Sequence, residues 1–251
     1  MKNLIIFLTV VFCSTAFSAV AKKNETPVKD FDNVVATTVE ALKLPGDSRM
    51  EFLAKLGPKA YKELMTVAFD SNYGMKVQWR ALTAMAMLGK ANAIPEVERA
   101  LQHKDWYLRN AGLVVMNEVK PSKAREWAKK LIADPSLIVR TEAVGVLRKN
   151  RDLSARKLLW ERLYDKQNFR GTQSLWVRRH IVETLGEMKT KGDEMKFLKV
   201  LDDKDKSLHP AALSALEALT QKHFGEPHDS VNQKAKLWRK FFANNKNKTR
   251  I

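Results

Sequence analysis

The stretch that decides the fold is Asp134-Pro-Ser-Leu-Ile-Val-Arg-Thr-Glu-Ala-Val-Gly-Val-Leu147. Its Asp-Pro-Ser start is typical of a turn, and the apolar residues that follow recur at helical spacing. The stretch therefore predicts a turn that opens a helix. Imperfect copies of the same pattern occur before and after it, and such self-similarity indicates a repeat architecture.

The copies align on a valine-like residue followed by arginine and then by small and apolar residues. The intervals are 29, 31, 38 and 31 residues when the markers are Arg80, Arg109, Arg140, Arg178 and His209. The first copy is two residues out of step at Val77, so it matches less well. The long interval contains an insertion, Gln167 to Ser174, in the loop between two paired helices. Such an insertion is either a contact loop or a tolerated surface addition.

Each copy is predicted to form the second helix of a helix pair. Gly, Pro, Ser and Asn interrupt the apolar pattern between helices, and no segment alternates long enough to predict a strand. The fold class is therefore all-α, an α-α superhelix (solenoid) of about five helix pairs. The predicted pairs are 58–69 with 75–89, 94–103 with 106–119, 122–133 with 136–148, 155–165 with 174–189, and 193–202 with 207–222.

The ends of the array are predicted to be covered by capping helices, because a terminal repeat has one face without a neighbour. Residues 22–57 form the N-terminal cap, and residues 58–222 form the repeat array. Residues 223–243, with Trp238 and Phe241 at helical spacing, form an aromatic C-terminal cap. The basic tail 244–251 is predicted to be disordered.

The array resembles the short HEAT-like repeats first associated with phycobilin lyases, in an exported bacterial form. The likeness rests on the turn aspartate Asp134, on Val139-Arg140, and on Ala143 and Leu147. Asp105, Leu108-Arg109 and Ala111 match in part, whereas His209-Pro210 departs from the pattern in the fifth unit. The resemblance implies a HEAT-like solenoid over roughly Pro58 to Lys222 and implies little about activity.

The N-terminus predicts a cleavable signal peptide over residues 1–21. Lys2 precedes an apolar run, and the run ends in the small-x-small motif Ala19-Val-Ala21 before Lys22. A membrane anchor is the alternative, but serines and a threonine dilute the second half of the run. We expect cleavage after Ala21 and a periplasmic or secreted protein. The mature chain would then lack the single cysteine, Cys13, and with it disulfides and thiolate chemistry.

The chain carries a net charge of +17, and its basic residues concentrate in the middle. Sixteen basic and six acidic residues lie between Lys120 and His180. A large field of one sign attracts acidic surfaces and anions. The candidate binding surface consists of Lys123, Arg125, Lys129, Lys130, Arg148, Lys149, Arg151, Arg156, Lys157, Arg162, Lys166, Arg170 and Arg179. A solvated, solubility-preserving shell is the alternative interpretation.

The recurring arginines have two interpretations, a ladder that braces adjacent repeats and a binding surface. The favoured one is a structural ladder of Asp105, Arg109, Asp134, Arg140 and Arg178. Three tryptophans, Trp79, Trp106 and Trp176, start second helices beside this ladder. They are either core packing or part of a groove in which arginine and aromatic rings meet a ligand.

The sequence indicates a binding protein and no enzyme. No His-Glu pair, GxSxG motif, phosphate loop or dinucleotide fingerprint occurs, so we assign no catalytic residue, metal or cofactor. The leading hypothesis is an exported scaffold that binds a protein or an anionic cell-envelope polymer through its basic middle repeats. The alternative is nucleic-acid binding, related in design to HEAT-like DNA glycosylases, which export disfavours. Neither oligomeric state nor partner identity follows from the sequence.

Overall fold

The computed structural model describes residues 34–248, and these form an all-α solenoid. The expected signal peptide and its cleavage site at Ala21 lie outside the described residues, as do residues 22–33 of the expected N-terminal cap and the last three residues of the tail. Five helix pairs follow one another, which confirms the predicted fold class. The pairs are α3 (Pro58–Phe69) with α4 (Met75–Gly89), α5 (Ile94–Leu101) with α6 (Trp106–Val119), α7 (Pro121–Leu131) with α8 (Leu137–Lys149), α9 (Arg156–Leu163) with α10 (Val177–Glu187), and α11 (Glu194–Val200) with α12 (His209–Thr220).

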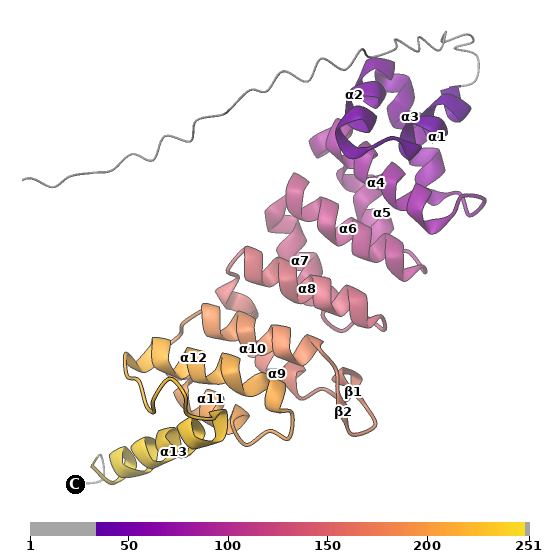
Figure 1. The fold of residues 1–251 in the computed structure, drawn as a ribbon. Helices are drawn as coiled ribbons and strands as arrows, with labels where there is room; N and C mark the ends of the chain where they lie inside the picture. Colours follow the sequence, from indigo (N-terminus) through magenta and orange to yellow (C-terminus); the bar gives the residue numbers. More distant parts are fainter. Residues whose placement is uncertain (1–33, 249–251) are drawn as a thin grey trace, which may run out of the picture. The chain divides into compact units, whose positions relative to one another are not determined.

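The second helices of the pairs pack directly against one another. α4 contacts α6, α6 contacts α8, α8 contacts α10, and α10 contacts α12, so these helices form one layer in sequence order (Figure 1). We call this the B layer. Because every B helix occupies the same place in its repeat, the first turns all lie along one edge, which we call the loop edge.

The core lies between the B layer and the first helices of the pairs. Small and branched residues in the first half of the B helices are fully buried, for example Ala111, Ala143 and Ile181. Gly112 lies so close to Leu101 that an added Cβ would be 3.0 Å from the Leu101 side chain. Close helix packing of this kind requires small residues at the contact.

Shorter elements connect and cover the pairs. α1 (Val34–Lys43) and α2 (Gly46–Leu56) pack on α3 and α4, and α13 (Val231–Lys248) packs on α11 and α12. Three 3-10 turns lead into helices, η1 (Lys90–Ala93), η2 (Leu153–Ala155) and η4 (Lys206–Leu208), and a fourth, η3 (Lys166–Asn168), leads into the inserted segment.

Two expectations are corrected. The insertion contains a two-stranded hairpin, β1 (Phe169–Arg170) with β2 (Gln173–Ser174), although no strand was predicted. Strands of two residues are too short to show alternation, and Gly171, at φ +60°, supplies the turn. The tail is helical as far as Lys248, because no Gly or Pro ends α13 after residue 243.

Candidate functional site

A row of polar side chains joins successive repeats at the loop edge. In each B helix one residue of the first turn bonds the loop of its own repeat, and three of them also bond the loop of the next. These residues are Gln78, Arg109, Arg140, Arg178 and His209. Their spacings are 31, 31, 38 and 31 residues. The structure thus places Gln78, and not Arg80, at the equivalent position of the first repeat.

Arg109 shows the bond pattern most completely. Its Nη1 donates to the carbonyl oxygens of His103 and Lys104 in its own loop, at 2.8 and 2.7 Å. Its Nε and Nη2 donate to both carboxylate oxygens of Asp134 in the next loop, at 2.6 and 2.7 Å. The bond to Asp134 raises the pKa of Arg109. A bidentate pair of this kind fixes both distance and orientation between two repeats.

Arg140 bridges the next junction without a carboxylate. Its Nη1 donates to the Asp134 carbonyl at 2.7 Å, its Nε to Asn168 Oδ1 at 2.9 Å, and its Nη2 to the Gln167 carbonyl at 2.7 Å. Burial lowers the pKa of Arg140. The insertion therefore supplies the partners of this arginine, and Asn168 takes the place of an aspartate.

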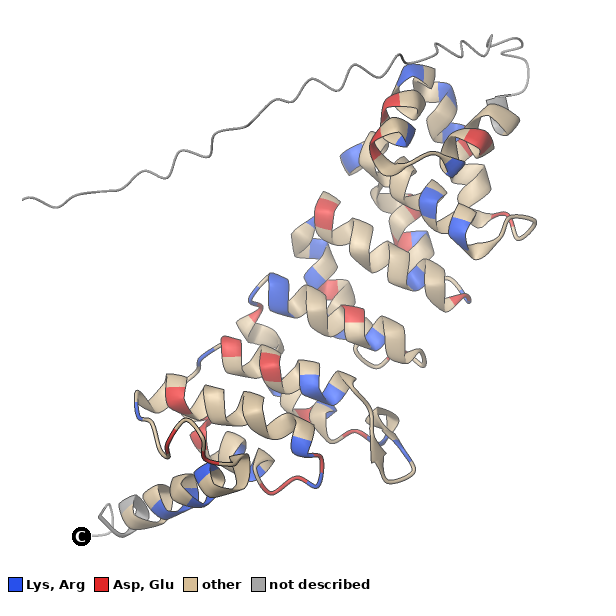
Figure 2. Ribbon diagram, viewed as in Figure 1, with Lys and Arg blue, Asp and Glu red and all other residues tan. Residues whose placement is uncertain are grey.

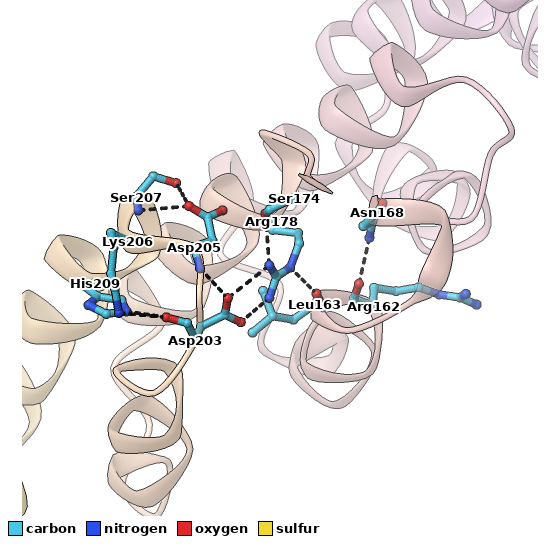
Figure 3. Close-up of polar contacts among 10 residues, drawn as sticks. All are labelled: Arg162, Leu163, Asn168, Ser174, Arg178, Asp203, Asp205, Lys206, Ser207 and His209. Carbon is cyan, nitrogen blue, oxygen red and sulfur yellow. Dashed lines mark hydrogen bonds and ion pairs between the residues drawn. The ribbon is translucent and has the colours of Figure 1, made fainter. Parts of the chain in front are cut away.

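Arg178 lies at the centre of the last junction (Figure 3). Its Nε donates to the Leu163 carbonyl at 2.8 Å and its Nη1 to Ser174 Oγ at 3.0 Å. Its Nη2 lies 2.5 Å from Asp203 Oδ2, and the side chain is only 1% exposed. Asp203 in turn accepts from the backbone N–H of Asp205, and its carbonyl lies 3.0 Å from His209 Nε2.

Asp105 is the member of the predicted ladder that the structure leaves out of the row. His103 occupies the position that Asp134 and Asp203 occupy in their loops, and its Nδ1 accepts the N–H of Asp105. Asp105 accepts instead from Tyr107, whose hydroxyl also donates to Gln78 at 2.6 Å. The sequence pattern assigned this position to Asp105 because it expects an aspartate in the turn, whereas His103 accepts the turn N–H in this repeat.

The basic side chains of the middle repeats lie on several elements, from α7 to α10, including the insertion. Figure 2 shows Lys and Arg along the described helices with Asp and Glu between them. Most of them contact acids of a neighbouring repeat or turn. The pairs are Lys123 with Glu98, Lys129 with Asp152, Arg148 with Glu183 and Glu187, Lys149 with Glu118, Arg156 with Asp193, Arg162 with Asp165, and Arg179 with Glu183.

The remaining members of the basic set make no ion pair within residues 34–248. Lys130 lies over the ring of Trp127, with Nζ 4.6 Å from the ring centroid. The others are Arg125 on α7, Arg151 after α8, Lys157 on α9, and Lys166 and Arg170 in the insertion. Only the last two belong to the loop edge.

A second feature of the loop edge is a row of exposed apolar side chains. Four consecutive B helices each carry one at or just before their first turn: Met75 is 48% exposed, Trp106 37%, Ile138 43% and Trp176 57%. We call these four residues the apolar row. The indole N–H of Trp176 donates to Thr141 Oγ1 of the preceding B helix at 3.0 Å. Exposed apolar side chains that recur at the starts of neighbouring helices are typical of an interaction surface.

Positive charge accompanies the apolar row. Five basic side chains at the loop edge have no acidic partner in the described part of the chain: Lys76, Lys104, Lys166, Arg170 and Lys204. None of the five B helices has a side-chain hydrogen bond at its N-cap. Their first-turn amides therefore add partial positive charge at this edge. The aspartates here, such as Asp205, are occupied in holding loop N–H groups.

The hairpin and the loop before α12 enclose a pocket of about 680 Å³ at the end of the apolar row. Trp176, Phe169 and Leu175 form its apolar wall, and Arg178 with Asp203 lies at its base. No group of three or more His, Cys, Asp or Glu side chains in residues 34–248 is arranged to hold a metal ion. Nor is any helix in this range both long and apolar enough to span a membrane.

Glu142 on α8 is a carboxyl for which no hydrogen bond or ion pair occurs within residues 34–248. Burial raises its pKa above the ordinary value of 4.5, while Lys149 lowers it. The folded chain therefore holds this proton to higher pH than the unfolded chain, and stability falls as pH rises from 4.5 through the raised pKa.

We expect Glu142→Gln to raise the thermal midpoint at pH 7.5 by about 1–3 °C and to have no effect at pH 4. Thermal unfolding followed by circular dichroism at both pH values measures this difference. Glu126→Gln on the exposed face of α7 is the control. An equal shift at both pH values would show that the effect is unrelated to ionisation of Glu142.

The comparisons with known proteins give a likeness in structure and none in sequence. No protein-family model matches the chain, and no curated protein matches it either. Among solved structures, a designed armadillo repeat protein is similar over 74% of this chain and 100% of its own length, with 17% sequence identity and a TM-score of 0.45.

Proposed function

We propose that this chain is an exported, non-enzymatic scaffold of HEAT-like repeats that binds an extended segment of a protein partner along the loop edge. The observation that carries the proposal is the apolar row, because four consecutive B helices each expose a large apolar side chain two or three residues before Gln78, Arg109, Arg140 or Arg178. A solenoid buries a continuous core and leaves a long surface available to partners. The proposal of export rests on residues 1–21 alone. Mass spectrometry of the protein from the cell-envelope fraction would show whether the mature chain begins at Lys22.

The geometry of the B layer suits an extended chain. Packed helices lie about 8–10 Å apart, and an extended chain advances about 3.3–3.6 Å per residue. A bound segment would therefore meet one member of the apolar row about every three residues. Each large apolar side chain that passes from water into a contact contributes up to about 1.5–3 kcal/mol.

Charge favours an acidic segment. Lys76, Lys104 and Lys204 flank the apolar row without acidic partners, and the uncapped first turns of the B helices add to the positive field. Carboxylates of the partner would be attracted to this edge, and the attraction would speed association. A polymer that carries only negative charge is less well matched, because the basic side chains of the middle repeats are dispersed and mostly paired.

A selection from a random peptide library on the immobilised full chain tests the proposal. We expect enriched peptides to combine acidic residues with apolar residues about three positions apart. Trp106→Ala combined with Ile138→Ala should weaken binding of the best peptide by about 10- to 100-fold, measured by calorimetry. Met195→Ala is the control, because Met195 is an exposed apolar residue on α11, outside the B layer.

Added salt should weaken the same complex, because the flanking charges are exposed. Enrichment of peptides without acidic residues, or an affinity that is unchanged in the double variant, would contradict the proposal. Binding of single-stranded DNA that is lost in the same double variant would support the nucleic-acid alternative instead.

A further inference from the structure

The pocket beside Trp176 has features that an extended protein segment does not require. It lies between the inserted hairpin and the loop before α12 and has a volume of about 680 Å³. This volume is within the range of small-ligand sites. The other repeats cannot form the same pocket, because the insertion that forms one of its sides occurs only in the fourth repeat.

One wall is a fixed aromatic face. Trp176 is 57% exposed, and its only polar atom already donates to Thr141 Oγ1 at 3.0 Å. The hydrogen bond holds the indole edge in place, so the surface that remains available is the ring face. Leu175 and Phe169 also line the pocket, and the Phe169 ring lies under the Arg178 guanidinium at 4.3 Å.

The polar lining of the pocket is balanced in charge, because Arg178 and Lys204 offset Asp203 and Asp205. Arg178 is paired with Asp203, and Asp205 accepts from the N–H of Ser207 at 3.0 Å and from its hydroxyl at 2.6 Å. Burial opposes ionisation of Asp205, but hydrogen bonds from Ser174 and Ser207 outweigh it and lower the pKa of this carboxyl. These residues therefore present fixed carboxylate acceptors beside the paired Arg178 guanidinium, and the balanced lining favours neither an anionic nor a cationic ligand.

The rim supplies free hydrogen-bonding groups. The side chains of Thr172 and Gln173 and the ammonium group of Lys204 line the pocket and have no partner within residues 34–248. Hydroxyl and amide groups both donate and accept, and the lysine donates. A ligand that leaves these groups dry and unpaired would bind at a cost.

We infer that this pocket binds a neutral pyranose ring, as a free sugar or as one unit of a glycan. One face of such a ring presents C–H groups that pack on an indole face, and its edge presents hydroxyls that pair with carboxylates, amides and ammonium groups. An aromatic side chain would fill the wall but leave the rim and base unpaired. The inference shares Trp176 with the apolar row, but it requires neither Trp106 nor Ile138, so the two proposals can fail separately.

Titration of the ¹⁵N-labelled full chain with the methyl pyranosides of glucose, galactose and mannose tests the inference by NMR. We expect saturable shifts of the Trp176 indole N–H and of the Gln173 side-chain amide with at least one of the three. Trp176→Phe identifies the indole signal by removing it. Trp176→Ala should weaken binding about tenfold, and Trp106→Ala should leave it unchanged.

N-acetyltyrosinamide serves as the aromatic probe in a parallel titration. Saturable binding of a pyranoside with little response to this probe supports the inference. The inference is overturned if no pyranoside gives saturable shifts up to about 100 mM, where weak binding is still measurable. It is also overturned if the aromatic probe binds at Trp176 more tightly than every pyranoside, or if Trp106→Ala abolishes the response.

Discussion

Arg178→Ala is expected to lower the free energy of unfolding by about 3–5 kcal/mol. The side chain is 1% exposed, and its removal leaves the Asp203 carboxylate without its cation and the Leu163 carbonyl without its donor. Both groups would remain largely shielded from water, and unpaired buried polar groups are costly. Urea unfolding followed by circular dichroism measures the loss.

Arg179→Ala is the matched control, because the neighbouring arginine is 60% exposed and pairs with Glu183 on the same helix. Exposed pairs of this type contribute about 0–1 kcal/mol. Asp203→Ala and the double variant complete a cycle, and strong coupling between the two sites is expected because they share one ion pair. If Arg178→Ala costs no more than Arg179→Ala, the arginine row does not brace the repeats.

The fold could be predicted from the sequence because the same local pattern recurs in several repeats. Val139-Arg140 and Val177-Arg178 each place a buried branched residue beside the arginine that reaches the next loop. The register of the first repeat was wrong in one respect. The sequence alignment took Arg80 as the marker because it is an arginine. In the structure Gln78 lies at the position equivalent to Arg109 and donates a hydrogen bond to the Asp70 carbonyl. Hydrogen-bonding capacity, and not charge, is what the position requires.

The count of basic and acidic residues between Lys120 and His180 overestimates the unpaired positive charge of the middle repeats. A count along the chain does not include acids that lie one repeat away, such as Glu98 opposite Lys123 and Glu118 opposite Lys149. Stacking brings these pairs together, so residues about 25 to 31 positions apart neutralise each other. Partners at that distance become predictable only once the repeat register is known.

The candidate site was predicted only in outline. Trp106 and Trp176 were noted beside the arginines, but their exposure depends on which side of each B helix the neighbours cover. Met75 and Ile138 carried no signal of their own, because an apolar residue in an amphipathic helix is most simply assigned to the core. The pocket depends on a hairpin of two-residue strands, which lies below the length at which alternation is visible.

Trp238→Ala is expected to destabilise the chain by about 3–5 kcal/mol, because it deletes the largest fully buried side chain of the C-terminal cap. The Trp238 ring contacts Phe224 edge-on, with centroids 4.7 Å apart, and stacks with Phe242 at 5.9 Å. α13 covers α11 and α12, and a solenoid is stabilised by contacts between neighbours only. Loss of the cap should therefore expose the fifth repeat, and amide hydrogen exchange should increase in α11 and α12 but not in α4.

Two further variants separate this role from simple loss of apolar surface. Trp238→Phe keeps an aromatic ring and removes an indole N–H that is buried without a hydrogen-bond partner in the described chain, so it should cost less than about 1.5 kcal/mol. Leu237→Ala changes the adjacent residue, which is 38% exposed, and should cost less than Trp238→Ala. Equal losses for Leu237→Ala and Trp238→Ala would mean that the aromatic cluster does not hold the cap in place. Because a cap acts through its neighbour alone, exchange rates in α4 should be unchanged in all three variants under native conditions.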